Sequence, residues 1–228
     1  MTVRAVFMEE YDFTCTDAAQ SLGDMIVKSL QRPSAEVLQL LANLVAVNTM
    51  DETIVRKDGT RSGNPTECAL LQFVRDLGFD YEFIRNNTRG RSGVGALSEF
   101  LSEGKQMNFS SARKMMSWAV PLDNGGYRLY TKGAPEVVLK RCSRELVHGH
   151  ADMPDNVRGK IHEMIEVYAR RGMRTLGLAY RDFPKNTKIT DIDENDMTLV
   201  ALVGIEDPLR AEVPHAIEKC YRAGIDVR

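Results

Sequence analysis

The sequence has no run of apolar residues approaching the roughly 20 that a membrane-spanning helix needs. Its first residues, MTVRAVFMEE, lack the charged region and the following apolar region of a secretory signal peptide. The net charge is −2, so the chain also has no excess of basic residues for a nucleic-acid partner. We therefore expect no direct membrane insertion of this chain and no binding to nucleic acid.

Metal-binding and catalytic motifs are absent as well. The four cysteines lie far apart and form no C-x-x-C pair, which favours a reduced, cytosolic setting over disulfides or zinc. The stretch DIDENDMTLVAL begins like a calcium loop, but it has Asp196 where a glycine is needed and Leu202 where a glutamate is needed. There is no P-loop, no G-x-G-x-x-G and no Ser/His/Asp order typical of hydrolases. We predict no metal ligand and no catalytic residue.

The sequence does contain an alternation of strand and helix patterns. Strand pairs interleaved with helices, and few β-α-β units, indicate an α+β fold in which a twisted antiparallel sheet is flanked by helix pairs and hairpins. Residues 85–104, rich in Gly, Asn, Ser and Arg, are predicted to form a loop. The expected strands are 2–8, 53–59, 114–122, 126–132, 174–180 and 198–206; the expected helices follow Ser34 and Ala134, span 64–78 and 153–172, and include Val213 to Tyr221.

The segment DNGG predicts a hairpin between the strands at 114–122 and 126–132. A two-residue loop would place Lys132 opposite Ser117 and put Lys114 on the other face of the sheet. A three-residue loop with a glycine bulge would place Lys132 opposite Trp118, with Lys114 on the same face. If both lysines serve one ligand, we predict the bulged turn.

Several residues have the chemistry that a nucleotide requires. A carboxylate in the first turn of a helix can accept hydrogen bonds from an amino group, and a lone aromatic ring can stack on a base, which is worth about 1–3 kcal/mol. Lysines offer charges for phosphate, and a glycine allows backbone and ligand to approach closely. These residues are Glu67, Phe109, Lys114, Lys132, Gly133 and Arg174, the last on the same side of its strand as Leu176 and Leu178.

Each of these residues also has a plain structural interpretation. Phe109 alone is more often a core aromatic, a lysine at the end of a strand is more often a solvated charge, and Glu67 is a good residue for the start of a helix. Composition and spacing alone leave both interpretations open.

Five segments together resemble the cytosolic nucleotide-binding domain of P-type cation ATPases. They are GNPTECALLQFV, NFSSARKMMSW, YTKGAPEVVLKRC, RRGMRTLGLAYRDF and VGIEDPLRAEVPHAIEKCYRAGIDVR. The resemblance covers nearly the whole chain, and TECALL, ARKMMS and GIEDPLR are especially similar to the plasma-membrane calcium pump branch.

The resemblance implies a set of ATP-binding residues. Phe109 matches the phenylalanine that stacks on adenine, Glu67 the glutamate on the helix, and Lys132 beside Gly133 the lysine deep in the pocket. Ser111 stands where many relatives have an arginine that contacts a phosphate. The full set implied is Glu67, Phe109, Ser111, Lys114, Lys132, Gly133, Arg174 and Leu176 for ATP, and Asp207, Pro208 and Arg210 for a hinge. Mg²⁺ is expected only through the nucleotide, as MgATP.

The resemblance also implies a domain organisation. Residues 1–207 are expected to form the nucleotide-binding domain, with 1–8 and 200–210 as hinge strands, and 208–228 to be a fragment of the phosphorylation domain. In the family, the phosphorylated aspartate lies just before a segment similar to the first residues of this chain. Further motifs of the phosphorylation domain lie just after a segment similar to GIDVR. The chain is therefore expected to hold the adenosine part of MgATP, to deliver the γ-phosphate to an aspartate in another domain, and to hydrolyse nothing alone.

The implied parent is an integral membrane protein, a calcium-transporting ATPase of the plasma membrane or of an internal calcium store, and this chain is expected at the cytosolic face of that membrane. Its phosphorylation and actuator domains are the expected protein partners, and the chain itself is expected to be a monomer. Two other functions remain open: a regulatory or scaffold domain of the same fold that does not bind nucleotide, and a free-standing ATP hydrolase.

Overall fold

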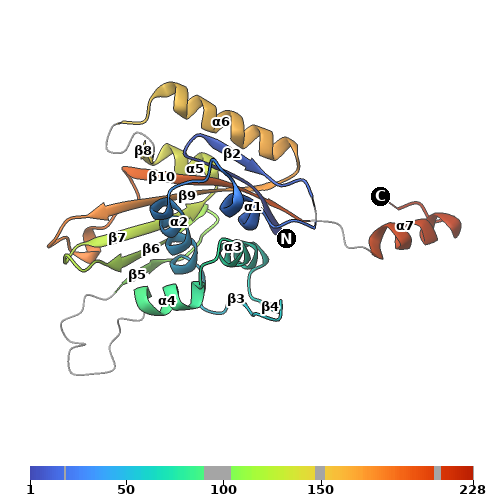
Figure 1. Ribbon diagram of the computed structural model, residues 1–228, viewed down its shortest axis with the longest axis horizontal. Coiled ribbons are helices and arrows are strands. Elements are labelled where there is room, and N and C mark those ends of the chain that lie inside the picture. The colour runs from blue at the N-terminus through green and yellow to red at the C-terminus, as the bar shows by residue number, and fades with distance from the viewer. Residues whose placement is uncertain (18, 90–103, 147–151, 208–211, 228) are drawn as a thin grey trace.

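The computed structural model describes residues 1–17, 19–89, 104–146, 152–207 and 212–227. In this part of the chain, eight strands form one sheet in the order β2-β1-β10-β9-β7-β6-β5, with β8 paired to β10 (Figure 1). All pairs are antiparallel except β8–β10, which is parallel. The strands are β1 (Thr2–Met8), β2 (Tyr11–Thr14), β5 (Lys105–Met107), β6 (Met115–Pro121), β7 (Tyr127–Gly133), β8 (Cys142–Glu145), β9 (Arg174–Phe183) and β10 (Met197–Glu206).

Helices cover both faces of this sheet, because side chains that alternate along its central strands enter two different cores. On β9, Leu178 belongs to the larger core and the next residue, Ala179, to the smaller one. The larger core lies under α1 (Leu22–Lys28), α2 (Ala35–Val47), α3 (Pro65–Asp76) and α4 (Tyr81–Arg89), and the smaller core under α5 (Pro135–Lys140) and α6 (Asp155–Arg170). The predicted α+β class with an antiparallel sheet and flanking helices is confirmed.

The start of α2 shows how local sequence produces these elements. The side chain of Ser34 accepts a hydrogen bond from the Val37 amide and so caps the first turn, as predicted. The buried residues that follow keep helical spacing and face the larger core. They are Leu38, Leu41, Ala42, Leu44, Val45, Ala46 and Val47.

The predicted loop at 85–104 is wrong at its beginning, because α4 continues to Arg89. The helix starts where the Asp80 carboxylate accepts hydrogen bonds from the amides of Glu82 and Phe83, at 3.0 Å each. Tyr81 is fully buried, and its hydroxyl lies 2.9 Å from both the amide and the carbonyl of Val55 in β3 (Ile54–Val55), which pairs with β4 (Arg61–Ser62). Residues 90–103 of the predicted loop lie outside the described residues.

The hairpin between β6 and β7 has the predicted bulged, three-residue turn. The Gly125 amide donates to the Leu122 carbonyl at 3.0 Å, Gly125 has a φ of +82°, and the Leu122 amide donates to the Gly126 carbonyl at 2.8 Å. The predicted register is wrong, since Lys132 pairs with Met116 rather than Trp118. A shift of two residues keeps every side chain on its face, so Lys132 still faces the predicted side of the sheet.

The chain beyond β10 contains α7 (Glu212–Arg222), none of whose residues is buried. Figure 1 shows this helix beyond the end of the sheet. Of the predicted hinge residues, Asp207 is exposed, and its carboxylate lies 3.4 Å from the amino group of Met1. Pro208 and Arg210 lie outside the described residues. No helix in the described ranges has both the length and the apolar character for a bilayer crossing.

Candidate functional site

The site begins at the N-terminus of α3. The Asn64 side chain accepts hydrogen bonds from the amides of Thr66 and Glu67, and Pro65 occupies the first turn, where a missing amide hydrogen costs nothing. This start places Glu67 at the helix end that carries partial positive charge. Glu67 is only 5% exposed, so its carboxylate lies within the protein and needs internal partners.

Lys132, near the end of β7, supplies the main partner. Its Nζ lies 2.5 Å from Glu67 Oε1 and also donates to the Asn48 carbonyl. The other carboxylate oxygen of Glu67, Oε2, accepts from the Thr53 hydroxyl at 2.7 Å and from the Met50 amide at 3.1 Å. The sequence suggested that Lys132 is a solvated charge or a cation available to phosphate, whereas in the structure it forms a buried ion pair with Glu67.

These contacts determine the charge state of Glu67. Burial alone would raise the pKa of this carboxyl, but the nearby Lys132 ammonium and the hydrogen bonds from Lys132, Thr53 and Met50 hold it below its usual value. Glu67 is therefore ionised at neutral pH, and the ion pair is intact there.

Phe109 lies in a turn between β5 and β6, and 61% of it is exposed. It is therefore not a core residue, and the plain interpretation of this aromatic is wrong. Lys114, at the end of this turn, is exposed, and its Nζ lies 4.0 Å from Glu136 Oε1 at the start of α5. Ser111 lies in the same turn as Phe109 and is also exposed.

Arg174 lies across from α3, at the first position of β9. Its guanidinium donates to the Thr66 hydroxyl at 2.7 Å, which joins the beginning of β9 to the first turn of α3. Leu176, two residues further along the strand, lies on the same side and packs against the larger core.

These elements enclose one cavity of about 730 Å³, within the range of about 300–1,000 Å³ typical of small-molecule sites. Of the predicted ATP-binding residues, the cavity is lined by Glu67, Phe109, Lys114, Lys132, Gly133, Arg174 and Leu176, but not by Ser111. Both lysines reach it, as the bulged hairpin requires. The lining residues that the sequence did not indicate are Met50, Asn64, Thr66, Asn108, Met116, Ala134 and Thr175.

Gly133 has a packing role that the sequence did not reveal. A Cβ added there would lie 2.5 Å from the Met115 Cβ and 2.6 Å from the Lys114 carbonyl oxygen. The glycine therefore lets β7 lie close to the start of β6, beside the cavity.

We expect Gly133→Ala to lower the free energy of unfolding by about 1–3 kcal/mol, because the new methyl group displaces β6. Gly159→Ala is the matched control, since an added Cβ in this exposed part of α6 meets no atom within 4 Å. It should raise the free energy of unfolding by about 0.5–1 kcal/mol through helix propensity. Urea denaturation of both variants checks the opposite signs, and a neutral Gly133→Ala would contradict the packing role.

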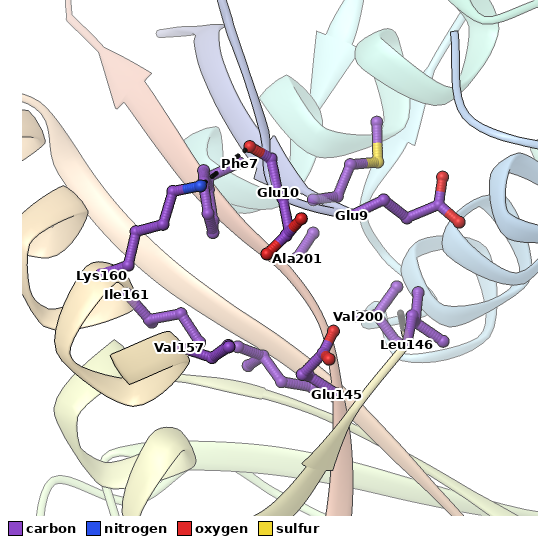
Figure 2. Close-up of a pocket in the computed structure, with 12 residues that line it drawn as sticks. Phe7, Glu9, Glu10, Glu145, Leu146, Val157, Lys160, Ile161, Val200 and Ala201 are labelled. Atoms are coloured by element: carbon purple, nitrogen blue, oxygen red, sulfur yellow. Dashed lines mark hydrogen bonds between the residues drawn. The ribbon is translucent and has the colours of Figure 1, made fainter. Parts of the chain in front are cut away.

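A second hollow lies between the β1–β2 turn, β8, β10 and α6 (Figure 2). Lys160 lies above the Phe7 ring, with its Nζ 5.6 Å from the centroid, and Glu9 and Glu145 line the opposite side. Burial and the Glu145 charge raise the pKa of Glu9 against the effect of a backbone hydrogen bond from Ser34. The hollow has a volume of about 20 Å³, room for about one water molecule, so it does not fit a nucleotide.

Comparison with known proteins identifies relatives of this chain. Residues 36–212 match a family described as "P-type ATPase, cytoplasmic domain N". Plasma membrane calcium-transporting ATPase 2 of Oreochromis mossambicus is 39% identical over 223 residues, and ATPase 3 of Homo sapiens is 37% identical over 227; each match covers 91% of this chain. Plasma membrane calcium-transporting ATPase 1 of Mus musculus is 43% identical over 174 residues, 73% of this chain.

This chain spans only a small part of those relatives, 19%, 18% and 13% of their respective lengths. The predicted resemblance to P-type ATPases, and to the plasma-membrane calcium pump branch among them, is confirmed.

Proposed function

The chain belongs to the P-type ATPase family, as the cytoplasmic domain N, and from this premise we propose that it binds the adenosine part of MgATP in the cavity described above. One observation carries the proposal: a cavity of about 730 Å³ is lined at once by an exposed aromatic ring and by three cationic side chains. They are Phe109, Lys114, Lys132 and Arg174. An aromatic face suits a purine, and the exposed cations Lys114 and Arg174 suit the phosphates.

The exposure and the partners of each side chain indicate which part of the nucleotide it would contact. The exposed ring of Phe109 is available for stacking on adenine. Lys132 already pairs with Glu67, so this pair supplies the polar wall beside the nucleoside. Lys114 and Arg174 are exposed at the edge of the cavity and can contact the phosphates without first losing a buried partner. Mg²⁺ would enter with the phosphates, and we assign it no ligand from this chain.

We also propose an activity for the longer protein, and the names of the relatives support it. We assign residues 1–207 to the nucleotide-binding domain and 208–228 to the phosphorylation domain, with Asp207, Pro208 and Arg210 at the hinge between them. Closure at this hinge would carry the γ-phosphate to an aspartate in the phosphorylation domain, which is a positioning role in phosphoryl transfer. The parent would then be a calcium pump, with this domain and the actuator domain on the cytosolic face of its membrane.

Titration of the chain with MgATP, followed by amide NMR shifts, tests the binding proposal. We expect a Kd of about 1 mM, within tenfold, because one ring and a few exposed charges provide roughly 4 kcal/mol. The largest shifts should lie around Phe109, Lys114 and Arg174, and ATP affinity should fall as salt is raised because exposed charges are screened.

Adenosine is the matched control ligand. It keeps the stacking surface but has no phosphates, so its shifts should centre on Phe109 and depend little on salt. Saturable shifts that avoid the cavity would contradict the proposal. Release of phosphate from ATP by the purified chain would favour the hydrolase alternative.

A further inference from the structure

The turn that carries Phe109 comprises residues 108–114, and its own hydrogen bonds close it. The Lys114 amide donates to the Ser110 carbonyl at 2.7 Å, and the Arg113 amide donates to the Ser110 hydroxyl at 3.2 Å. Arg113 Nη1 donates to the Asn108 carbonyl at 2.9 Å. Because the Phe109 ring is largely exposed, its position depends on the backbone of this turn rather than on core packing.

A second contact of Arg113 ties the turn to a distant part of the chain. Its Nη2 donates to Glu194 Oε1, in the connection between β9 and β10. The Glu194 side chain is 10% exposed and that of Arg113 is 32% exposed, so solvent screens this pair only in part. The same guanidinium therefore bridges the residue before Phe109 and a nearly buried carboxylate.

Glu194 is in turn fixed to the sheet. Ser117 donates to Glu194 Oε1 at 2.5 Å, and its hydroxyl lies 2.8 Å from that of Thr131 on the neighbouring strand. Ser117 and Thr131 are each one residue away from Met116 and Lys132, which line the cavity, so their side chains point to the opposite face. Neither Arg113 nor Glu194 lines the cavity.

We propose that Arg113 and Glu194 are positioning residues that hold Phe109 at the cavity for stacking on the base, without contacting the nucleotide themselves. This inference rests on the proposed function. The contacts of Arg113 connect the ring-bearing turn to the back of the β6–β7 pair, whose front carries Lys132. The turn that carries the ring is thereby joined, through Glu194 and Ser117, to the strand pair that carries Lys132.

A double-mutant cycle tests this inference on the 228-residue chain. We expect Arg113→Ala to weaken ATP binding about three- to tenfold, since part of the stacking is lost when the turn moves. In a Phe109→Ala background, the same substitution should change the affinity less than about twofold, because the ring through which Arg113 acts is gone. Without nucleotide, Arg113→Ala should shift the amide signals of residues 108–114.

Two further variants separate positioning from folding. Glu194→Gln keeps the size of the side chain but removes its charge, and Arg113→Lys keeps a charge but lacks the fork that spans Asn108 and Glu194. Both should weaken binding by less than Arg113→Ala. Arg128→Ala is the matched control, because it breaks a bidentate ion pair with Asp182, with distances of 2.6 and 2.7 Å, on the same sheet. Arg128 does not line the cavity, so this variant should leave the ATP affinity unchanged.

The outcomes are distinct. Equal losses with and without the Phe109→Ala substitution would mean that Arg113 acts on the nucleotide directly, and unchanged affinity in Arg113→Ala, Arg113→Lys and Glu194→Gln would make the pair purely structural. Either result overturns this inference while the proposed function stands. Absence of ATP binding by the unmodified chain, or no effect of Phe109→Ala, overturns the proposed function and the inference with it.

Discussion

Replacing Lys132 by methionine is expected to lower the free energy of unfolding by about 3–5 kcal/mol, because it leaves a buried carboxylate without its cation. Glu67 is 5% exposed and Lys132 8% exposed, and Nζ lies 2.5 Å from Oε1. Methionine fills similar space with an apolar chain, so the loss reports on charge rather than on a cavity.

The loss should depend on pH with a definite sign. In the unmodified chain the folded pKa of Glu67 lies below the usual value of 4.5, so its contribution to stability is present above about pH 4.5 and is lost as the pH falls through the folded pKa. Without Lys132, burial dominates and the pKa of Glu67 rises above its usual value. Protonation then relieves the unpaired charge, and the difference from the unmodified chain should shrink between pH 7 and pH 5.

Urea denaturation at the two pH values measures this difference. The double variant Glu67→Gln/Lys132→Met should recover most of the stability at pH 7, because no buried charge remains. Lys114→Met is the matched control, since this lysine borders the same cavity but is exposed, and it should change the free energy of unfolding by less than about 0.5 kcal/mol. A pH-independent loss in Lys132→Met would exclude the unpaired carboxylate as its cause.

Elements with strong local signals were predictable from the sequence. The start of α3 is encoded within four residues, because Asn64 caps the helix and Pro65 tolerates its first turn. α4 was missed because its stability comes from contacts far along the chain, such as those of Tyr81 with Val55. Its sequence, YEFIRNNTR, is mostly polar, with apolar or aromatic side chains only at Tyr81, Phe83 and Ile84, so tertiary packing decides its conformation.

In the candidate site, too, some features were predictable from the sequence and others depend on distant contacts. The family resemblance indicated seven of the residues that line the cavity, from segments that are far apart in the sequence. The contact of Lys132 with the Asn48 carbonyl was not predictable. The two residues are 84 positions apart, and every residue has a backbone carbonyl, so the sequence does not indicate which one accepts this hydrogen bond. The segment DNGG left both a two-residue and a three-residue turn open, and only the condition that both lysines serve one ligand favoured the bulged turn. The pairing of Lys132 in β7 with Met116 rather than Trp118 was not predictable from the turn residues.

Phe109→Ala is expected to weaken ATP binding by about 5- to 150-fold, because stacking on an aromatic ring contributes about 1–3 kcal/mol per base. Starting from a Kd of about 1 mM, the variant should therefore bind at about 5 mM or more weakly. The free energy of unfolding should stay within about 0.5 kcal/mol of the original, since the ring is 61% exposed. NMR titration and urea denaturation of the same sample measure the two quantities.

Two variants make the result specific to stacking. Phe109→Trp keeps an aromatic face and should retain affinity within about threefold. Phe83→Ala removes a ring of α4 that is 68% exposed but does not line the cavity, and it should leave affinity unchanged. If Phe109→Ala loses binding but not stability, and Phe83→Ala loses neither, the Phe109 ring contacts the nucleotide. Unchanged binding would instead favour a scaffold domain of this fold, because no other exposed aromatic ring among the described residues lines the cavity.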